Sequence, residues 1–226
     1  MKKIKGILLD IDNTLYDYEP CHQFAMDKCR LWIKNHFNIN ENSFNLAFKE
    51  SRKIINERLR ETAASHNRLL YFQLTLEKLE INALNYSLLL YNCYWDNFLS
   101  YMNPFKGIEY IFQKYNGNIC FVTDLTAHIQ HRKITSLNLA KYLNHLVTSE
   151  EAGCEKPGQN IFRLALEKLN LEANEVCMIG DNFDKDIIGA SNVSIQSIWL
   201  NRTKTTIILP ENCIEIKDIS SINKYI

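Results

Sequence analysis

The sequence predicts an α/β protein, with a Rossmann-like, doubly wound parallel sheet interrupted by an all-helical insert. Two observations lead to this prediction. Short apolar runs without a helical period alternate with segments of helical spacing, which is typical of buried parallel strands joined by helices. In addition, no proline or glycine occurs between Cys21 and Met102, and apolar residues recur there at helical spacing. We therefore expect a core of residues 1–15 and 103–226 and a helical cap of residues 16–102.

The elements of the core are expected in a regular order along the chain. The expected strands are residues 4–9, 118–123, 145–149, 175–180 and 195–200, and residues 213–216 are a candidate edge strand. The expected helices are residues 104–115, 127–138, 159–169 and 184–191. Because strands alternate with helices, the connections should be right-handed crossovers between parallel strands. The insert far exceeds the usual connection of about 2 to 6 residues, and long insertions of this kind are usually functional.

Composition and charge narrow the class of partner. Lys plus Arg equals Asp plus Glu at 26 each, so no overall field would attract nucleic acid or an anionic membrane. No apolar stretch approaches the roughly 18 residues of a spanning helix. The seven cysteines are odd in number and contain no Cys-x-x-Cys pair, which argues against a disulfide framework and a zinc ribbon. We expect a soluble, cytoplasmic protein, a monomer or homodimer, whose partner is a small molecule.

Two carboxylates directly follow the first expected strand, in the sequence LLDIDNTLYD. Side chains two apart in an extended segment point to the same side, so Asp10 and Asp12 should face one ligand at the carboxyl end of that strand. Two such carboxylates repel each other unless a cation lies between them, and oxygen ligands suit Mg²⁺. A calcium-binding EF-hand loop is excluded, because Leu15 stands where its glycine is needed and Cys21 where its glutamate is needed.

A second acidic cluster follows the strand expected at 175–180. Gly180 permits close approach of the backbone, Asp181 lies at the strand tip, and Asp186 lies at the start of the next helix. Stabilisation of the helix N-terminus explains Asp184 better than a metal role does. Asp181 matches the position of Asp10 and most simply completes an oxygen site for one cation.

Two further residues stand where an anion could be held. Thr123 ends the second strand, where it could bind an anion or cap the next helix. Lys156 precedes Pro157 in the loop before the helix expected at 159. Most lysines are solvated, so Lys156 alone would carry little weight, and its significance comes from the other motifs.

In this order, Asp10-x-Asp12-x-Thr14, Thr123, Lys156 and Gly180-Asp181 with Asp186 resemble the four-motif signature of the haloacid dehalogenase-like hydrolase superfamily. The motifs span nearly the whole chain, and the helical insert resembles the cap of subfamily I, which covers the active site. The resemblance implies a sheet order of 5-4-1-2-3, which would bring the ends of the first, second and fourth strands together.

The resemblance also implies a mechanism. Asp10 would be the nucleophile that forms an aspartyl phosphate, and Asp12 the general acid and base, oriented by Thr14. Thr123 and Lys156 would hold the phosphoryl oxygens. Mg²⁺ would bind Asp10, the backbone carbonyl of Asp12, and Asp181, while Asp186 would anchor Lys156 or a metal-bound water. Dehalogenases lack an acid at the position of Asp12, so this residue favours phosphoryl chemistry.

Two further positions, one in the core and one in the cap, bear on the choice of substrate. Asp124 follows Thr123 where the family often has Asn, and we expect its side chain to contact the substrate. In the cap, Ser65 is the expected N-cap of a helix beginning near His66, which places Arg68 on the first turn; a contact with a substrate anion competes there with a solvated role. The leading hypothesis is a Mg²⁺-dependent phosphatase of a small phosphorylated metabolite, a sugar phosphate or nucleotide. A phosphomutase of the same family and a non-catalytic, receiver-like phosphate-binding protein are the alternatives.

Overall fold

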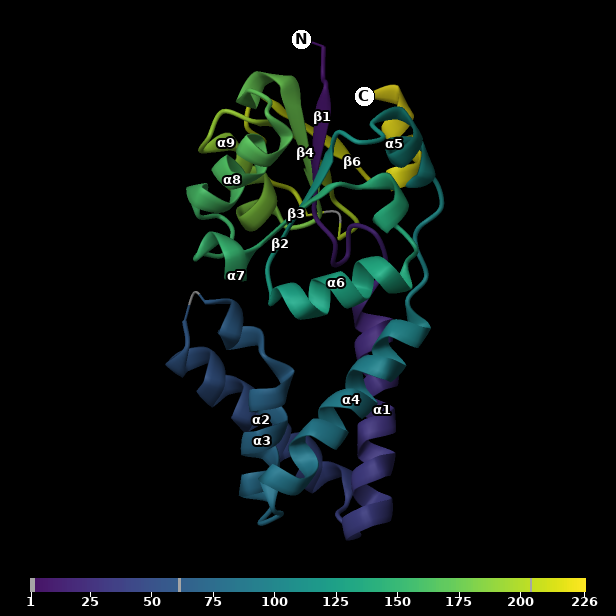
Figure 1. Ribbon diagram of the computed structural model, residues 1–226, viewed down its shortest axis with the longest axis vertical. Coiled ribbons are helices and arrows are strands. Elements are labelled where there is room, and N and C mark those ends of the chain that lie inside the picture. The colour runs from purple at the N-terminus through teal and green to yellow at the C-terminus, as the bar shows by residue number, and fades with distance from the viewer. Residues whose placement is uncertain (1–2, 61, 204) are drawn as a thin grey trace. The chain divides into compact units, whose positions relative to one another are not determined.

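The computed structural model describes residues 3–60, 62–203 and 205–226, and the chain divides into two compact units. One unit contains Met1–Asp17 and Asn103–Ile226, and the other contains Tyr18–Met102. Figure 1 shows a sheet with helices in the first unit and helices alone in the second. No helix among the described residues has both the length and the apolar character needed to cross a membrane.

The first unit is built on a six-stranded parallel sheet in the order β3-β2-β1-β4-β5-β6. Its strands are β1 (Gly6–Leu9), β2 (Ile119–Thr123), β3 (His145–Thr148), β4 (Val176–Gly180), β5 (Gln196–Leu200) and β6 (Cys213–Ile216). The predicted α/β class is confirmed. The observed strand order differs from the predicted order 5-4-1-2-3, because β6 adds a sixth strand beside β5. The neighbours of the other five strands are the same in both orders.

Helices cover both faces of this sheet (Figure 1). They are α5 (Glu109–Lys114), α6 (Ala127–Ser136), α7 (Ser149–Ala152), α8 (Gln159–Leu169), the π-helical turn η4 (Phe183–Ile188), α9 (Gly189–Ser191), and the 3-10 turns η2 (Ala140–Tyr142), η3 (Ala173–Glu175) and η5 (Ile219–Lys224). Ile161, Phe162 and Ala165 of α8 pack with Leu8 and Met178 of the central strands, all of them buried. This apolar layer fixes the strands whose ends carry the acidic residues.

The helix expected over residues 104–115 is shorter than predicted. It begins only at Glu109, because the chain before it is held in another conformation. The backbone N–H of Phe105 donates to the carbonyl of Leu15 at 2.8 Å. Gly107 then adopts a φ of +92°, which a helix does not permit. The contact with Leu15, far away in the sequence, therefore delays the start of the helix.

The second unit is entirely helical in its described residues. Its elements are α1 (Tyr18–Phe37), α2 (Glu41–Arg58), the 3-10 turn η1 (Ala63–His66), α3 (Arg68–Lys78) and α4 (Ala83–Tyr101). Buried aromatic side chains fill its centre, among them Phe44, Phe72, Tyr94 and Trp95. The prediction that Ser65 is the N-cap of α3 is wrong. Asn67 caps this helix, because its side chain accepts a hydrogen bond from the N–H of Leu69.

Candidate active site

The parallel register brings three strand ends to one edge of the sheet. Leu9, the last residue of β1, pairs with Phe121 of β2 and with Ile179 of β4. The ladder continues for one residue, since the N–H of Asp10 donates to the carbonyl of Ile179 at 3.0 Å. Asp10 therefore leaves β1 beside the end of β4, where Asp181 follows.

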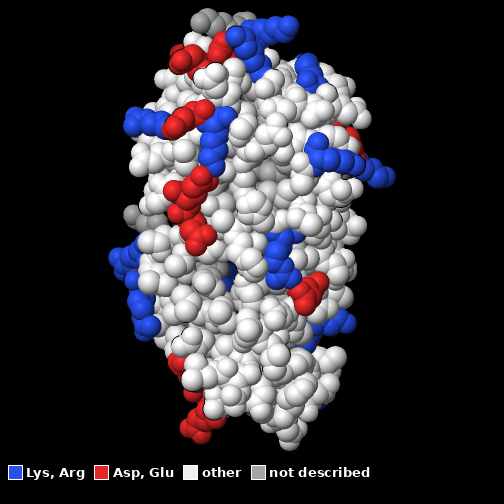
Figure 2. All heavy atoms as spheres, viewed as in Figure 1, with Lys and Arg blue, Asp and Glu red and all other residues white. Residues whose placement is uncertain are grey.

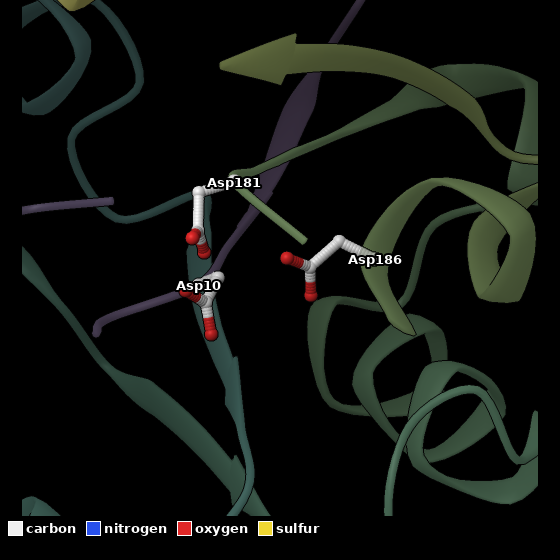
Figure 3. A group of neighbouring side chains, drawn as sticks. All are labelled: Asp10, Asp181 and Asp186. Carbon is white, nitrogen blue, oxygen red and sulfur yellow. The ribbon is translucent and has the colours of Figure 1, made fainter. Parts of the chain in front are cut away.

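Three carboxylates gather at this point, as Figure 3 shows. One oxygen each of Asp10, Asp181 and Asp186 can be chosen so that all three lie within 4.8 Å of one another. Gly180 makes room for them, because a Cβ atom at this position would lie 2.3 Å from Oδ2 of Asp186. The carboxylate of Asp186 is held further by the N–H of Asn182, which donates to the same oxygen at 3.0 Å.

A single lysine, Lys156, is bonded to this cluster among the described residues, and its side chain is 3% exposed. Its Nζ donates to Oδ1 of Asp10 and to Oδ1 of Asp186, both at 2.7 Å, and to the carbonyl of Val122 at 3.0 Å. The lysine lies in the loop before α8, as predicted, but its ammonium group is buried in the centre of the site rather than at the rim.

The electrostatics of the cluster favour a bound cation. Burial raises the pKa of Asp10 well above its ordinary value; Lys156 opposes this, and the neighbouring carboxylates of Asp186 and Asp181 add to it. Burial, followed by repulsion from Asp186, raises the pKa of Asp181 to about 7. Burial would lower the pKa of Lys156, but Asp10 and Asp186 outweigh it and raise that pKa well above its usual range. Three carboxylates thus share one ammonium group, and the remaining negative charge is what a cation would neutralise.

The donor set fits Mg²⁺. It consists of carboxylate oxygens alone, and hard divalent cations prefer such ligands. Asp10 and Asp181 lie at the ends of adjacent strands, and Asp186 approaches from η4. The same three residues were among the predicted metal ligands. Asp12, the fourth, does not belong to this group of side chains, and only its backbone carbonyl was expected to bind the metal.

The threonines of the predicted site each bond to a neighbouring group. Thr14 donates through Oγ1 to Oδ2 of Asp10 at 2.9 Å, rather than to Asp12, which the resemblance implied it would orient. Thr123 is 1% exposed, and its Oγ1 accepts a hydrogen bond from Nε2 of Gln130 at 2.8 Å. Thr123 is not the cap of α6, because that helix begins after Thr126.

Asp12 is held by two residues that sequence reasoning missed. Nζ of Lys133 lies 2.6 Å from Oδ1 and 2.7 Å from Oδ2 of Asp12, and the hydroxyl of Tyr16 donates to Oδ1. Both Lys133 and Tyr16 are fully buried. A signal for Lys133 existed in the sequence: it shares the spacing i, i+3, i+4, i+7 with Gln130, Ile134 and Leu137, the inward stripe of α6.

Asp124 is engaged by the protein itself. Its Oδ1 accepts the backbone N–H of Lys156 at 3.0 Å, and its Oδ2 forms an ion pair with Nζ of Lys185 at 2.8 Å. These contacts fix the loop that carries Lys156. The expected contact of Asp124 with substrate stays a prediction, and in this structure both its oxygens already have partners.

Arg68 belongs to the helical unit and is 7% exposed, so it is not the solvated side chain that sequence reasoning favoured. Its guanidinium donates to the hydroxyl of Tyr18 and to the carbonyl of His66 at 3.0 Å. The same group lies over the rings of Tyr71 and Tyr94, at 5.2 and 5.7 Å from their centroids. These contacts make Arg68 part of the interior of this unit.

The face of the molecule in Figure 2 shows no large area of a single charge among the described residues. On the face shown in Figure 2, lysine and arginine side chains of the described residues alternate with acidic side chains and uncharged surface.

Comparison with known proteins gives a consistent result. The family model described as haloacid dehalogenase-like hydrolase matches residues 4–193. A ribulose-1,5-bisphosphate 5-phosphatase from Halopiger xanaduensis is 33% identical over 202 residues, which cover 85% of this chain and 83% of the relative. A glyceraldehyde 3-phosphate phosphatase from Methanopyrus kandleri is 26% identical over 222 residues, 95% of this chain and 91% of the relative.

The fold comparison agrees. The crystal structure of a HAD phosphatase from Thermococcus onnurineus superposes with a TM-score of 0.73 at 22% sequence identity, and the match covers 98% of this chain and 97% of that one. At this identity the likeness concerns the fold alone.

Proposed function

Because the chain belongs to the haloacid dehalogenase-like hydrolases and is a phosphoric monoester hydrolase, we propose that it is a Mg²⁺-dependent phosphatase of small sugar phosphates acting through an aspartyl phosphate. The observation that carries the proposal is the buried ion cluster in which Nζ of Lys156 lies 2.7 Å from oxygens of both Asp10 and Asp186. The names of the two relatives describe those proteins as phosphatases of sugar phosphates.

Asp10 is the nucleophile in this proposal. Its carboxylate is held by Thr14 on Oδ2 and by Lys156 on Oδ1, so both oxygens are fixed in orientation. An oxygen of Asp10 bonds to phosphorus while the ester bond to the sugar oxygen breaks. A nucleophile held in advance loses little freedom as it reacts, and this lowers the barrier.

Lys156 and Thr123 bind the phosphoryl oxygens. Lys156 brings a buried positive charge, whose interaction with a dianion is stronger than it would be in water. Gln130 donates to Oγ1 of Thr123, and the threonine hydroxyl donates to the carbonyl of Asp124 at 3.3 Å, a long hydrogen bond that it would exchange for one to an anion. Bound Mg²⁺, held by Asp10, Asp181 and Asp186, would neutralise charge on the phosphoryl oxygens.

Asp12 moves the proton. As the sugar oxygen leaves, the protonated carboxyl of Asp12 gives it a proton; the resulting carboxylate then takes a proton from the water that attacks the aspartyl phosphate. That water forms a bond to phosphorus, the bond to Asp10 breaks, and orthophosphate and the free carboxylate of Asp10 result. The two steps leave the enzyme in its starting state.

The test measures release of orthophosphate from glyceraldehyde 3-phosphate, ribulose 1,5-bisphosphate and p-nitrophenyl phosphate, with Mg²⁺ and with EDTA. We expect Mg²⁺-dependent release by the wild type and a loss of at least about 1,000-fold in Asp10→Asn. Asp184→Asn is the control: it also replaces an Asp by Asn, but Asp184 is exposed and lies outside the buried cluster. Equal rates in Asp10→Asn and wild type, or no release from any of the three esters, would contradict the proposal.

A further inference from the structure

Helix α6 presents a lysine to the interior of the core. Lys133 is 0% exposed and lies on the inward stripe with Ile134 and Leu137, a position normally taken by an apolar side chain. Burying an ammonium group costs free energy unless the group is paired and hydrogen-bonded. An apolar residue would pack at this position at lower cost, so the lysine requires an explanation beyond packing.

Its partner is the carboxylate of Asp12. Nζ of Lys133 lies 2.6 Å from Oδ1 and 2.7 Å from Oδ2, and the hydroxyl of Tyr16 donates to Oδ1. The two donors come from different segments, α6 and the loop after β1, and both are fully buried. A carboxylate held from two directions cannot rotate freely, so these contacts set the direction in which Asp12 presents its remaining lone pairs.

We propose that Lys133, assisted by Tyr16, is the positioning residue for the proton transfers of Asp12, an inference that rests on the proposed phosphatase function. Within the described part of the chain, Oδ1 accepts hydrogen bonds from both residues, whereas Oδ2 accepts one from Lys133 only. Oδ2 thus retains more acceptor capacity, and the side chain of Asp12 is 25% exposed. The geometry assigns the exchanged proton to Oδ2: it goes to the departing sugar oxygen and is replaced by one from the attacking water.

The charge of Lys133 serves the same step. The predicted site contains more acidic groups than basic ones. It has the four carboxyl groups of Asp10, Asp12, Asp181 and Asp186 and the two ammonium groups of Lys156 and Lys133. Without Lys133, the carboxylate that remains after Asp12 has given up its proton would add its negative charge to that of the cluster beside the bound phosphoryl group. Lys133 supplies the counter-charge from inside the protein, away from the face of Asp12 that is open to substrate.

The experiment compares kcat/KM of Lys133→Met for two phosphate esters. β-Glycerophosphate has an alkoxide leaving group that needs a proton, whereas the nitrophenolate of p-nitrophenyl phosphate leaves without one. We expect kcat/KM to fall about 100-fold for β-glycerophosphate and less than about 3-fold for p-nitrophenyl phosphate. Lys168→Met, which removes an ion pair with Glu151 in the same unit, is the control and should leave both values unchanged.

A second readout follows the hydrolysis of the intermediate. If Asp12 is displaced, the aspartyl phosphate forms normally from p-nitrophenyl phosphate but is hydrolysed slowly. Lys133→Met should then release a burst of nitrophenolate equal to the enzyme concentration, followed by a steady rate about 100-fold below that of the wild type. A role of Lys133 in folding alone would reduce the burst and the steady rate together.

A double-mutant cycle with Asp12→Asn and a milder variant complete the test. In the Asp12→Asn background, Lys133→Met should change the rates less than about 3-fold, because the group that it positions is already lost. Tyr16→Phe removes one hydroxyl and keeps the ring, so it should show the same ester dependence, at about 3- to 10-fold, even if Lys133→Met does not fold. Equal losses on both esters in the folded variants, or additive losses in the cycle, would overturn the inference while the wild type still hydrolysed phosphate. An inert wild type would instead overturn the proposed function, and the inference with it.

Discussion

Removal of one carboxylate from the acidic cluster should stabilise the metal-free protein at alkaline pH. Burial and repulsion by Asp186 raise the pKa of Asp181 to about 7 from an ordinary value of 3.8. An acid whose pKa is higher in the folded state binds its proton more tightly there than in the unfolded chain. Its contribution to stability is therefore fully present below about pH 4 and is lost as the pH rises to about 7.

The magnitude follows from the shift. A rise of about three pKa units corresponds to about 4 kcal/mol of unfolding free energy between the two ends of this range. The side chain of Asp181 is partly exposed, and water screens part of the repulsion, so we expect about 2 kcal/mol. Asn has almost the size of Asp and carries no charge. Asp181→Asn should thus be more stable than the wild type by about 2 kcal/mol at pH 8 and by less than about 1 kcal/mol at pH 5.

Urea unfolding in EDTA at pH 5 and at pH 8 measures this difference, with Asp184→Asn as the control. Asp184 is an exposed acid three residues along the same segment, so its loss changes the net charge equally without touching the buried cluster. Addition of Mg²⁺ at pH 8 reverses the order, because the cation removes the repulsion in the wild type. At about 100 times its dissociation constant it should stabilise the wild type by about 2.7 kcal/mol, and Asp181→Asn by much less.

Two results would refute this reasoning. If the wild type and Asp181→Asn showed the same dependence of stability on pH, the carboxylate of Asp181 would not be the group that titrates. If Mg²⁺ stabilised both proteins equally, the acidic cluster would not be its binding site. An effect of Asp184→Asn as large as that of Asp181→Asn would indicate general surface charge as the cause.

Two further changes probe the surroundings of the site and the interior of the helical unit. Asp124→Ala should lower kcat about tenfold, because it removes the acceptor of the backbone N–H of Lys156 and one of the two ion-pair partners of Lys185. Asp124→Asn can still accept from Lys156 and should recover most of the rate, and equal rates for the two variants would contradict a role through Lys156. Arg68→Met should reduce the free energy of unfolding by about 2 kcal/mol, since it removes the hydrogen bond to Tyr18 and two ring contacts. A raised KM at unchanged stability would instead support the predicted contact of Arg68 with substrate.

Sequence reasoning located side chains correctly where they lie next to a strand end. Asp10, Asp181 and Thr123 each end or directly follow a buried apolar run, and parallel strands place such residues at one edge of a sheet. Asp186 was placed correctly beside them because only one short turn separates it from β4. In each case a local pattern fixed the position of the side chain within one element.

It failed where a side chain depends on a distant segment. The position of Lys133 on the inward stripe of α6 was readable, but its partner Asp12 is 121 residues away in the sequence. The contacts of Asp124 with Lys156 and Lys185 were missed in the same way, while its expected contact with substrate stays a prediction. Long polar side chains reach several ångströms in any direction, so the periodicity of an element does not determine their partners.

The parallel α/β class and the acidic residues at the strand ends could be read from the sequence, because hydrophobic periodicity and the ends of apolar runs are local properties of the chain. Only the tertiary structure decided which charges meet. Lys156 is buried between Asp10 and Asp186, and Lys133 against Asp12. The physical reason is that a buried charge is tolerated only with a partner in contact, and packing of the whole core, rather than any one segment, brings these partners within hydrogen-bonding distance.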